Sequence, residues 1–196
     1  WDNSPMTEAR LAHEVWQAIK DEDWVLTAST LKDWVQKVWD FDEPYRHPGR
    51  ELGTGSQIGM SIGTALAHRG SGRLVVDLQP DGDLMFDLGA LWVPVKYDIP
   101  MLVVMYNNRA YYNDWAHQIH MAHKRGTDVA RASIGMDLEG PEPDFAHIAK
   151  GIGWYAEGPI AEPGDVAPAV RRAIQRVKAG TPALVDVICW RRGENA

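Results

Sequence analysis

The sequence predicts an α/β fold, in which a mainly parallel sheet carries helices on both faces. Two observations predict it: short apolar runs of strand length alternate with segments of helical periodicity, and these runs are rich in β-branched residues. The chain has 196 residues, of which 45% are hydrophobic, which is enough to bury the core of one domain. We therefore expect residues 1–196 to form a single domain.

The first part of the chain predicts a helix, a strand and two further helices. Residues 7–20 place apolar side chains on one helical face, and residues 24–28 are a short apolar strand. Helical spacing returns in residues 31–39, and the small-residue segment 56–68 forms a helix that can pack closely on a sheet. Residues 41–55, rich in Pro and Gly, form the loop between these helices.

The middle of the chain predicts one β-α-β unit. Residues 73–79 and 101–106 are apolar strands, and residues 86–97 between them have helical spacing. Pro94 should kink this helix, because proline lacks the N–H group that a helix interior requires. The two strands should be parallel neighbours, with their carboxyl ends at the same edge of the sheet.

The last part of the chain continues the alternation. Residues 145–153 and 166–180 predict helices, and residues 154–158 and 182–190 predict strands. Residues 109–142 are polar and weakly periodic, so they form either a flexible lid over an active site or a surface excursion.

Composition and charge exclude several classes of function. The formal net charge is -7 and no block of Lys or Arg occurs, which argues against nucleic acid as a partner. No apolar stretch approaches the ~18 residues of a membrane span, and no basic-then-apolar leader opens the chain. The single cysteine, Cys189, lies in an apolar run, which predicts a buried thiol and a cytoplasmic protein. The initial Trp1 is more typical of a fragment than of a complete gene product.

Polar residues follow both strands of the β-α-β unit. Asp81, Gly82 and Asp83 follow the first strand, and Asn107 and Asn108 end the second. Either group alone is an ordinary turn, but together they would supply the carboxylate and amide oxygens that Mg²⁺ or Ca²⁺ prefers. Because Mg²⁺ commonly completes its coordination with phosphate oxygens and water, the pattern predicts a site for a metal-bound diphosphate.

Residues 80–108, PDGDLMFDLGALWVPVKYDIPMLVVMYNN, resemble the thiamine-diphosphate signature, in which G-D-G is followed after a spacer by N-N. This signature is typical of the family of acetolactate synthase, benzoylformate decarboxylase and pyruvate decarboxylase. Residues 53–67, 144–153 and 180–190 also resemble segments of that family. The resemblance implies a thiamine-diphosphate-binding fold and, specifically, the pyrophosphate-binding domain, the last of three in such enzymes.

The resemblance also implies roles for individual residues. Asp81, Asn108 and the carbonyl of Ala110 would hold Mg²⁺. The backbone of Gly82 and Asp83 would lie at the diphosphate, hydroxyl groups after the first strand would contact it, and the backbone near residue 53 would grip the aminopyrimidine. The predicted contacts to thiamine diphosphate are Ser29, Thr30, Leu52, Gly53, Thr54, Gly82, Asp83, Asn108, Ala110 and Tyr111.

Two positions depart from the family pattern. Thr54 falls where the family has a bulky apolar residue that props the bent cofactor, so either the support is weaker or Ile58 or Met60 is the prop. Pro80 replaces the first Gly of G-D-G, so the strand must end there without a ladder hydrogen bond from that residue.

The resemblance places the glutamate that activates the cofactor on a pyrimidine-binding domain, which no part of this sequence matches. Glu8, Glu14 and Glu51 are interpreted as surface carboxylates, so the catalytic residue of this chain is unknown. The partner domain would come from the same or another chain, in a homodimer, a homotetramer or a hetero-oligomer, and the substrate would be a small 2-oxo acid.

Three functions remain open. The chain is the catalytic domain of a decarboxylase or carboligase of the acetolactate synthase type, the small subunit of a split enzyme that resembles sulfopyruvate decarboxylase, or a non-catalytic domain that retains the fold. The last would not bind thiamine diphosphate even beside its partner domain.

Overall fold

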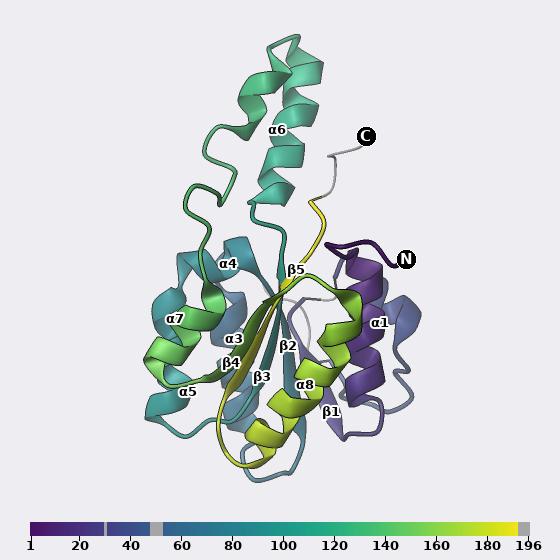
Figure 1. The fold of residues 1–196 in the computed structure, drawn as a ribbon, viewed down its shortest axis with the longest axis vertical. Coiled ribbons are helices and arrows are strands. Elements are labelled where there is room, and N and C mark those ends of the chain that lie inside the picture. Colours follow the sequence, from purple (N-terminus) through teal and green to yellow (C-terminus); the bar gives the residue numbers. More distant parts are fainter. Residues whose placement is uncertain (30, 48–52, 192–196) are drawn as a thin grey trace.

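The computed structural model describes residues 1–29, 31–47 and 53–191. Within these residues, five strands form one sheet in the order β1-β2-β3-β5-β4, and each neighbouring pair is parallel (Figure 1). The predicted α/β fold with a parallel sheet is confirmed. The strands are β1 (Trp24–Thr27), β2 (Leu74–Pro80), β3 (Leu102–Asn107), β4 (Tyr155–Ile160) and β5 (Ala183–Ile188).

Helices cover both faces of this sheet, as predicted. Figure 1 shows α1 and α8 together on one side, with α3, α4, α5 and α7 on the other. No helix in the described part of the chain combines the length and the apolar character needed to cross a membrane. The helices are α1 (Glu8–Ile19), α2 (Trp34–Val38), α3 (Gln57–Ala67), α4 (Asp81–Phe86), α5 (Trp92–Lys96), α6 (Tyr112–Arg125), α7 (Phe145–Ile152) and α8 (Pro163–Lys178), with 3-10 turns η1 (Leu88–Leu91) and η2 (Val129–Ser133).

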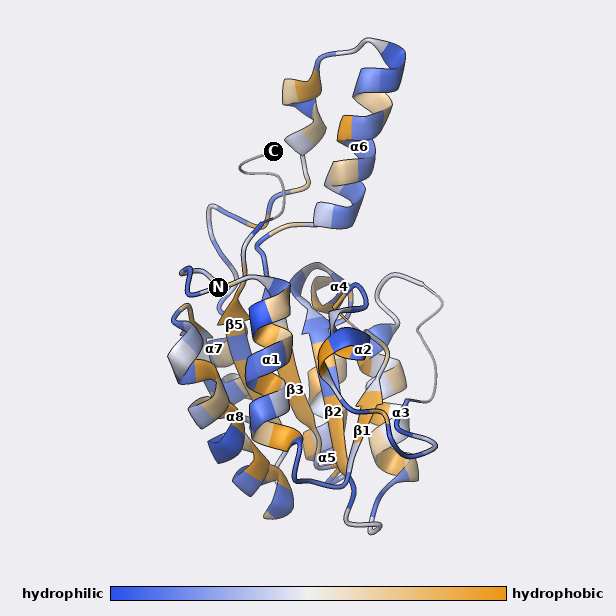
Figure 2. Cartoon of the chain, turned by 90° about the vertical axis from the view of Figure 1, so that its right-hand side faces the viewer, coloured by the Kyte–Doolittle hydropathy of each residue, from blue (hydrophilic) through white to orange (hydrophobic). Residues whose placement is uncertain are grey.

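Two apolar layers make up the core, one on each face of the sheet. Successive side chains of a strand point to opposite faces, so Val76 packs against α1 and α8 whereas Val75 packs against α3 and α7. Figure 2 shows the hydrophobic strands enclosed by helices whose outer sides are mostly hydrophilic. Cys189 is buried as predicted, and burial raises the pKa of its thiol well above the usual value.

The structure corrects two helix predictions. The helix predicted from residue 31 begins only at Trp34, because Leu31, Lys32 and Asp33 have φ angles of 49°, 50° and 72°, outside the right-handed helical range. The helix predicted over residues 86–97 is broken at Asp87, which has a φ of -143°.

Pro94 does not produce the predicted kink. It lies in the first turn of α5, where backbone N–H groups make no hydrogen bond within the helix, so the absence of an N–H group in proline breaks no helical bond. The polypeptide already turns at Asp87, so the connection between β2 and β3 consists of α4, η1 and α5 rather than one bent helix.

Residues 109–142 contain regular structure that the sequence did not predict. Helix α6 rises from the carboxyl end of β3, and η2 packs beside it on the returning segment (Figure 1). The helix has no continuous apolar face: within α6 only Ala122 is buried, and its surface is largely hydrophilic in Figure 2. His117, His120 and His123 all lie on this largely solvent-facing helix.

Candidate functional site

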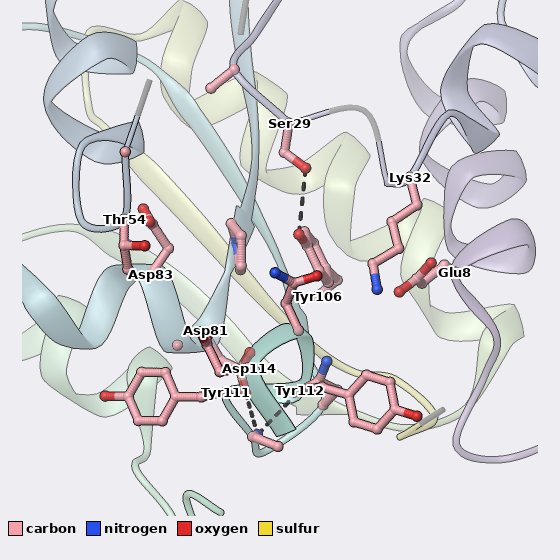
Figure 3. A pocket seen from close by; sticks show the side chains of 17 residues that line it. Glu8, Ser29, Lys32, Thr54, Asp81, Asp83, Tyr106, Tyr111, Tyr112 and Asp114 are labelled. Carbon is pink, nitrogen blue, oxygen red and sulfur yellow. Dashed lines mark hydrogen bonds between the residues drawn. The ribbon is translucent and has the colours of Figure 1, made fainter. Parts of the chain in front are cut away.

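A cleft of about 530 Å³ lies where the carboxyl ends of β2 and β3 meet the loop after β1 and the segment before α3 (Figure 3). The predicted juxtaposition of the acidic turn and the Asn107–Asn108 loop is confirmed, because Pro80 and Tyr106 pair at the end of the two parallel strands. The cleft is lined by Glu8, Ala28, Ser29, Lys32, Gly53, Thr54, Pro80, Asp81, Gly82, Asp83, Tyr106, Asn108, Ala110, Tyr111, Tyr112, Asn113 and Asp114.

Asp81 is a buried carboxylate at the start of α4. It is 1% exposed, and this burial raises its pKa to about 6, although backbone N–H groups of Gly82, Ala110 and Arg109 act in the opposite direction. Within the described residues no basic side chain forms an ion pair with Asp81. A cation bound here would therefore stabilise a negative charge that the surrounding protein leaves poorly compensated.

The turn after β3 brings two further oxygen atoms to Asp81. The N–H of Ala110 donates to Asp81 Oδ2 at 3.2 Å and to Asn108 Oδ1 at 3.0 Å, so both side chains approach the same nitrogen. The carbonyl oxygen of Ala110 lies 3.6 Å from the position that a Cβ atom on Gly82 would occupy. The oxygens of Asp81 and Asn108 thus lie near one backbone nitrogen, and the Ala110 carbonyl lies beside Gly82, the residue after Asp81. Carboxylate, amide and carbonyl oxygens are a donor set that suits a hard cation.

Gly82 allows the close approach of Tyr111. A Cβ atom at Gly82 would lie 2.8 Å from Tyr111 Cδ1, which is too short for an ordinary contact. The centroid of the Tyr111 ring lies 5.4 Å from that of the Phe86 ring. Burial, together with the charge of Asp81, raises the pKa of the Tyr111 phenol. Tyr111 is therefore a neutral wall of the cleft at physiological pH.

Asp83 turns its side chain away from the cleft floor toward the start of α3. Its carboxylate accepts hydrogen bonds from the backbone N–H groups of Gly55 and Gln57 and from Gln79 Nε2. The side chain thereby links the acidic turn to the segment that carries Gly53. Since the carboxylate is engaged, a contact from this residue to a ligand would come from its backbone, as predicted.

Thr54 faces the cleft, whereas the alternative props do not line it. Ile58, a residue of α3, is fully buried in the core between α3 and the sheet, and Met60 is not among the lining residues. The geometry therefore favours Thr54 at the position where the family has a bulky apolar residue. Ser29 also lines the cleft, with its hydroxyl 3.4 Å from that of Tyr106. The predicted contacts Thr30 and Leu52 lie outside the described residues.

The interpretation of Glu8 and Glu14 as surface carboxylates is wrong. Both are buried, at 7% and 8% exposure, and Glu14 pairs with Arg10 Nε at 2.8 Å. Glu8 lines the cleft, and Figure 3 shows Lys32 extending toward it. The sequence contained a signal, since Glu8 shares the inward face of α1 with Leu11. Glu51 lies outside the described residues.

A buried carboxylate beneath the cleft, Asp186, was also missed. Asn107 Nδ2 donates to Asp186 Oδ1 at 3.1 Å, and both residues are buried. Burial raises the pKa of Asp186 to about 7, the bond from Asn107 lowers it, and the charges of Asp81 and Asp144 raise it. The detectable signal was a single acidic residue inside the apolar strand ALVDVI. Among the described residues, no group of three or more His, Cys, Asp or Glu forms a metal-binding cluster.

Comparison with known proteins identifies the family. A family model described as "Thiamine pyrophosphate enzyme, C-terminal TPP binding domain" matches residues 28–187. The chain belongs to this family. The description of the family supports thiamine pyrophosphate, the same molecule as thiamine diphosphate, as its cofactor, and the resemblance seen in the sequence is confirmed.

Relatives of this C-terminal TPP-binding domain agree with that assignment. A Mycobacterium tuberculosis protein named "Putative acetolactate synthase large subunit IlvX" is 30% identical over 138 residues, which cover 69% of this chain and 26% of that protein. The Rhodococcus jostii RHA1 thiamine diphosphate-dependent 4-hydroxybenzoylformate decarboxylase has a TM-score of 0.75 at 23% identity, over 96% of this chain and 33% of that one. Benzoylformate decarboxylase from Polynucleobacter necessarius has a TM-score of 0.68 at 22% identity, over 93% of this chain and 33% of that one.

These comparisons define how far the likeness extends. The two solved structures share the fold, and the chain spans only about a third of each and 26% of the curated relative. The cleft of this TPP-binding domain is large enough for part of a cofactor, and Asp81, Asn108 and Ala110 line it with oxygen atoms. The residues present therefore fit a metal-bound diphosphate.

Proposed function

We propose that this chain is the pyrophosphate- and Mg²⁺-binding domain of an enzyme that decarboxylates 2-oxo acids or joins them to a second carbonyl compound. The observation that supports the proposal is that Asp81, Asn108 and Ala110 line one cleft of a TPP-binding domain, with Asp81 and Asn108 both bonded to the Ala110 N–H. The names of the similar proteins support this class of lyase or transferase: two are decarboxylases of benzoylformate compounds, and one is named "Putative acetolactate synthase large subunit IlvX".

The chain's own residues would bind and orient the cofactor. Asp81, Asn108 and Ala110 would give Mg²⁺ three oxygen ligands, which leaves octahedral positions for phosphate oxygens and water. The backbone of Gly82 and Asp83 would lie at the diphosphate, with Ser29 and Thr30 as hydroxyl contacts. When bound, the cofactor supplies a nucleophilic carbon and an electron sink for breaking or forming a bond beside a carbonyl group.

The upper part of the cleft would hold the rest of the cofactor. The backbone at Leu52 and Gly53 would contact the aminopyrimidine, and Thr54 and Tyr111 would line its path. We expect the activating glutamate on a pyrimidine-binding domain of the same or a partner chain, in a homodimer, a homotetramer or a hetero-oligomer. The segment 109–142 begins at the cleft and would act as a lid there. The buried, single cysteine supports a cytoplasmic location.

Isothermal titration calorimetry would test the proposal. Thiamine diphosphate is titrated into the complete protein, with its pyrimidine-binding domain present, in Mg²⁺ and in EDTA. Wild type should bind only with Mg²⁺, and Asp81→Ala and Asn108→Ala should lose this metal-dependent binding. Asp114→Ala is the matched control, because it removes an exposed carboxylate that lines the same cleft but is not a predicted ligand.

The outcomes separate the candidate functions. Metal-dependent binding lost in both ligand variants supports the catalytic hypothesis, and a screen of 2-oxo acids then tests turnover. Absence of binding by folded wild type beside its partner domain would instead favour a non-catalytic domain that retains the fold.

A further inference from the structure

The strand ends beneath the cleft form a buried polar row on the sheet face that carries α3 and α7. Alternate residues of β3 and β5 place Asn107 and Asp186 on this face, in continuation of the apolar Met105 and Leu184. Asn107 is 3% and Asp186 1% exposed. Burying an amide and a carboxylate costs free energy unless hydrogen bonds replace those lost to water. The hydrogen bonds of these two side chains therefore indicate what the pair does in the fold.

Asn107 connects β5 to the turn that follows β3. Its Nδ2 donates to Asp186 Oδ1 at 3.1 Å, and its Oδ1 accepts from the backbone N–H of Arg109 at 3.2 Å. Its carbonyl accepts from the N–H of Cys189 at 2.8 Å. Asp186 and the Arg109 N–H together orient the Asn107 amide, because an acceptor on β5 favours Nδ2 there and a donor in the turn favours Oδ1 there.

The turn needs such support. Arg109 has a φ of 58°, a left-handed backbone conformation that residues other than Gly, Asn and Asp rarely adopt. It lies between Asn108 and Ala110, so a change of its backbone would move both oxygens relative to Asp81. The bond from the Arg109 N–H to Asn107 holds this conformation in place.

We propose that Asp186 is a positioning residue of the metal site, which acts through Asn107 to hold the turn that presents Asn108 and the Ala110 carbonyl to the cation. The inference rests on the proposed metal-binding function and adds a residue that the family signature does not contain. Side chains that orient metal ligands typically change metal affinity by about 10- to 100-fold when they are removed.

Metal binding by Asp186 variants tests this role. Mn²⁺, which suits the same oxygen ligands as Mg²⁺, is titrated into the complete, EDTA-stripped protein in the presence of thiamine diphosphate, and free Mn²⁺ is measured by electron paramagnetic resonance. Asp186→Ala should weaken Mn²⁺ binding about 10- to 100-fold. Asp186→Asn keeps an oxygen that accepts from Asn107, so it should bind within about threefold of wild type.

Two further readouts separate positioning from simple destabilisation. Mg²⁺ demands near-ideal octahedral geometry whereas Ca²⁺ tolerates irregular sites, so competition with Mn²⁺ should show that Asp186→Ala loses more affinity for Mg²⁺ than for Ca²⁺. Val185→Ala is the matched control: the neighbouring side chain lies in the opposite core layer, so its loss should lower stability and leave metal affinity unchanged.

A double-mutant cycle completes the test. In an Asn107→Ala background, Asp186→Ala should cause no further loss of Mn²⁺ affinity, because the connection is already broken. Should Asp186→Ala fail to fold, Asn107→Ala alone must show the same loss of about 10- to 100-fold.

The inference is overturned if the Mn²⁺ affinity of Asp186→Ala equals that of Val185→Ala. It is also overturned if Asp186→Asn loses as much Mn²⁺ affinity as Asp186→Ala does. Failure of the proposed function has a different signature: Asp81→Ala would then bind Mn²⁺ as well as wild type does.

Discussion

Replacing Asp186 by asparagine should stabilise the metal-free protein at alkaline pH and have little effect at acidic pH. The pKa of this carboxyl is raised from 3.8 to about 7, chiefly because burial disfavours the charged form. In the unfolded chain the group ionises near its usual pKa. Between these two values the folded state holds a proton that the unfolded state has released, so the free energy of unfolding falls as pH rises.

The size of the effect follows from the two pKa values. A difference of about three units corresponds to about 4 kcal/mol of lost stability once the pH exceeds 7, where both states are ionised. About 2.5 kcal/mol of this loss falls between pH 5 and pH 8. The side-chain amide of the Asp186→Asn variant carries no titrating proton, and its oxygen can still accept from Asn107 Nδ2, so the variant lacks this contribution.

Urea denaturation in EDTA at several pH values between 5 and 8 measures this difference. Asp81 contributes a separate fall in stability of the same sign, because its pKa is about 6, so Asp81→Asn is measured alongside and the double variant should have the flattest profile. Parallel profiles for wild type and Asp186→Asn would refute the reasoning, since they would mean that Asp186 ionises equally easily in the folded and unfolded states.

Three further changes test the packing around the site. Gly158→Ala should destabilise the protein by about 3 kcal/mol or more in thermal unfolding, since φ is +132° there and the new Cβ would lie 2.6 Å from the Asp186 carbonyl oxygen. Gly82→Ala should weaken Mg²⁺-dependent thiamine diphosphate binding in calorimetry, and adding Tyr111→Ala should restore part of it, because the Cβ contacts that ring. Trp39→Phe should cost about 2 kcal/mol in urea denaturation, because the indole N–H donates to a carbonyl of α1 at 2.8 Å; an unchanged midpoint would contradict this.

The sheet and the meeting of its loops could be predicted because both depend on short-range patterns. Each of the five strands is a short run of four to seven residues in the sequence, and adjacent parallel strands necessarily bring their carboxyl ends together. That rule placed Asp81 beside Asn108 without any knowledge of side-chain geometry. Binding of Mg²⁺ and diphosphate by these residues stays a prediction until it is measured.

Helix α6 and the environment of Glu8 could not be predicted, for opposite reasons. Periodicity reveals a helix only where one face is buried, and within α6 only Ala122 is buried. Glu8 lies on the buried face of α1, but a carboxylate is normally assigned to the surface. The cleft that Glu8 lines is formed by other segments of the chain, among them the loop with Lys32 and the end of β3, which the sequence of α1 does not describe.

Asp186 shows how a sequence can carry the supporting residues of a site and still conceal them. In ALVDVI the alternation of a strand places Asp186 on a buried face, where an apolar side chain would pack without the cost of desolvating a charge. That apolar side chain could not accept from Asn107, and the amide would then lose one of the two hydrogen bonds that orient it toward the N–H of Arg109. The stability that Asp186 costs at alkaline pH comes from burial of its charge, whereas the metal affinity that it is proposed to supply comes from its hydrogen bond with Asn107. Asp186→Leu removes both, so it should remove the pH-dependent loss of stability and weaken metal binding.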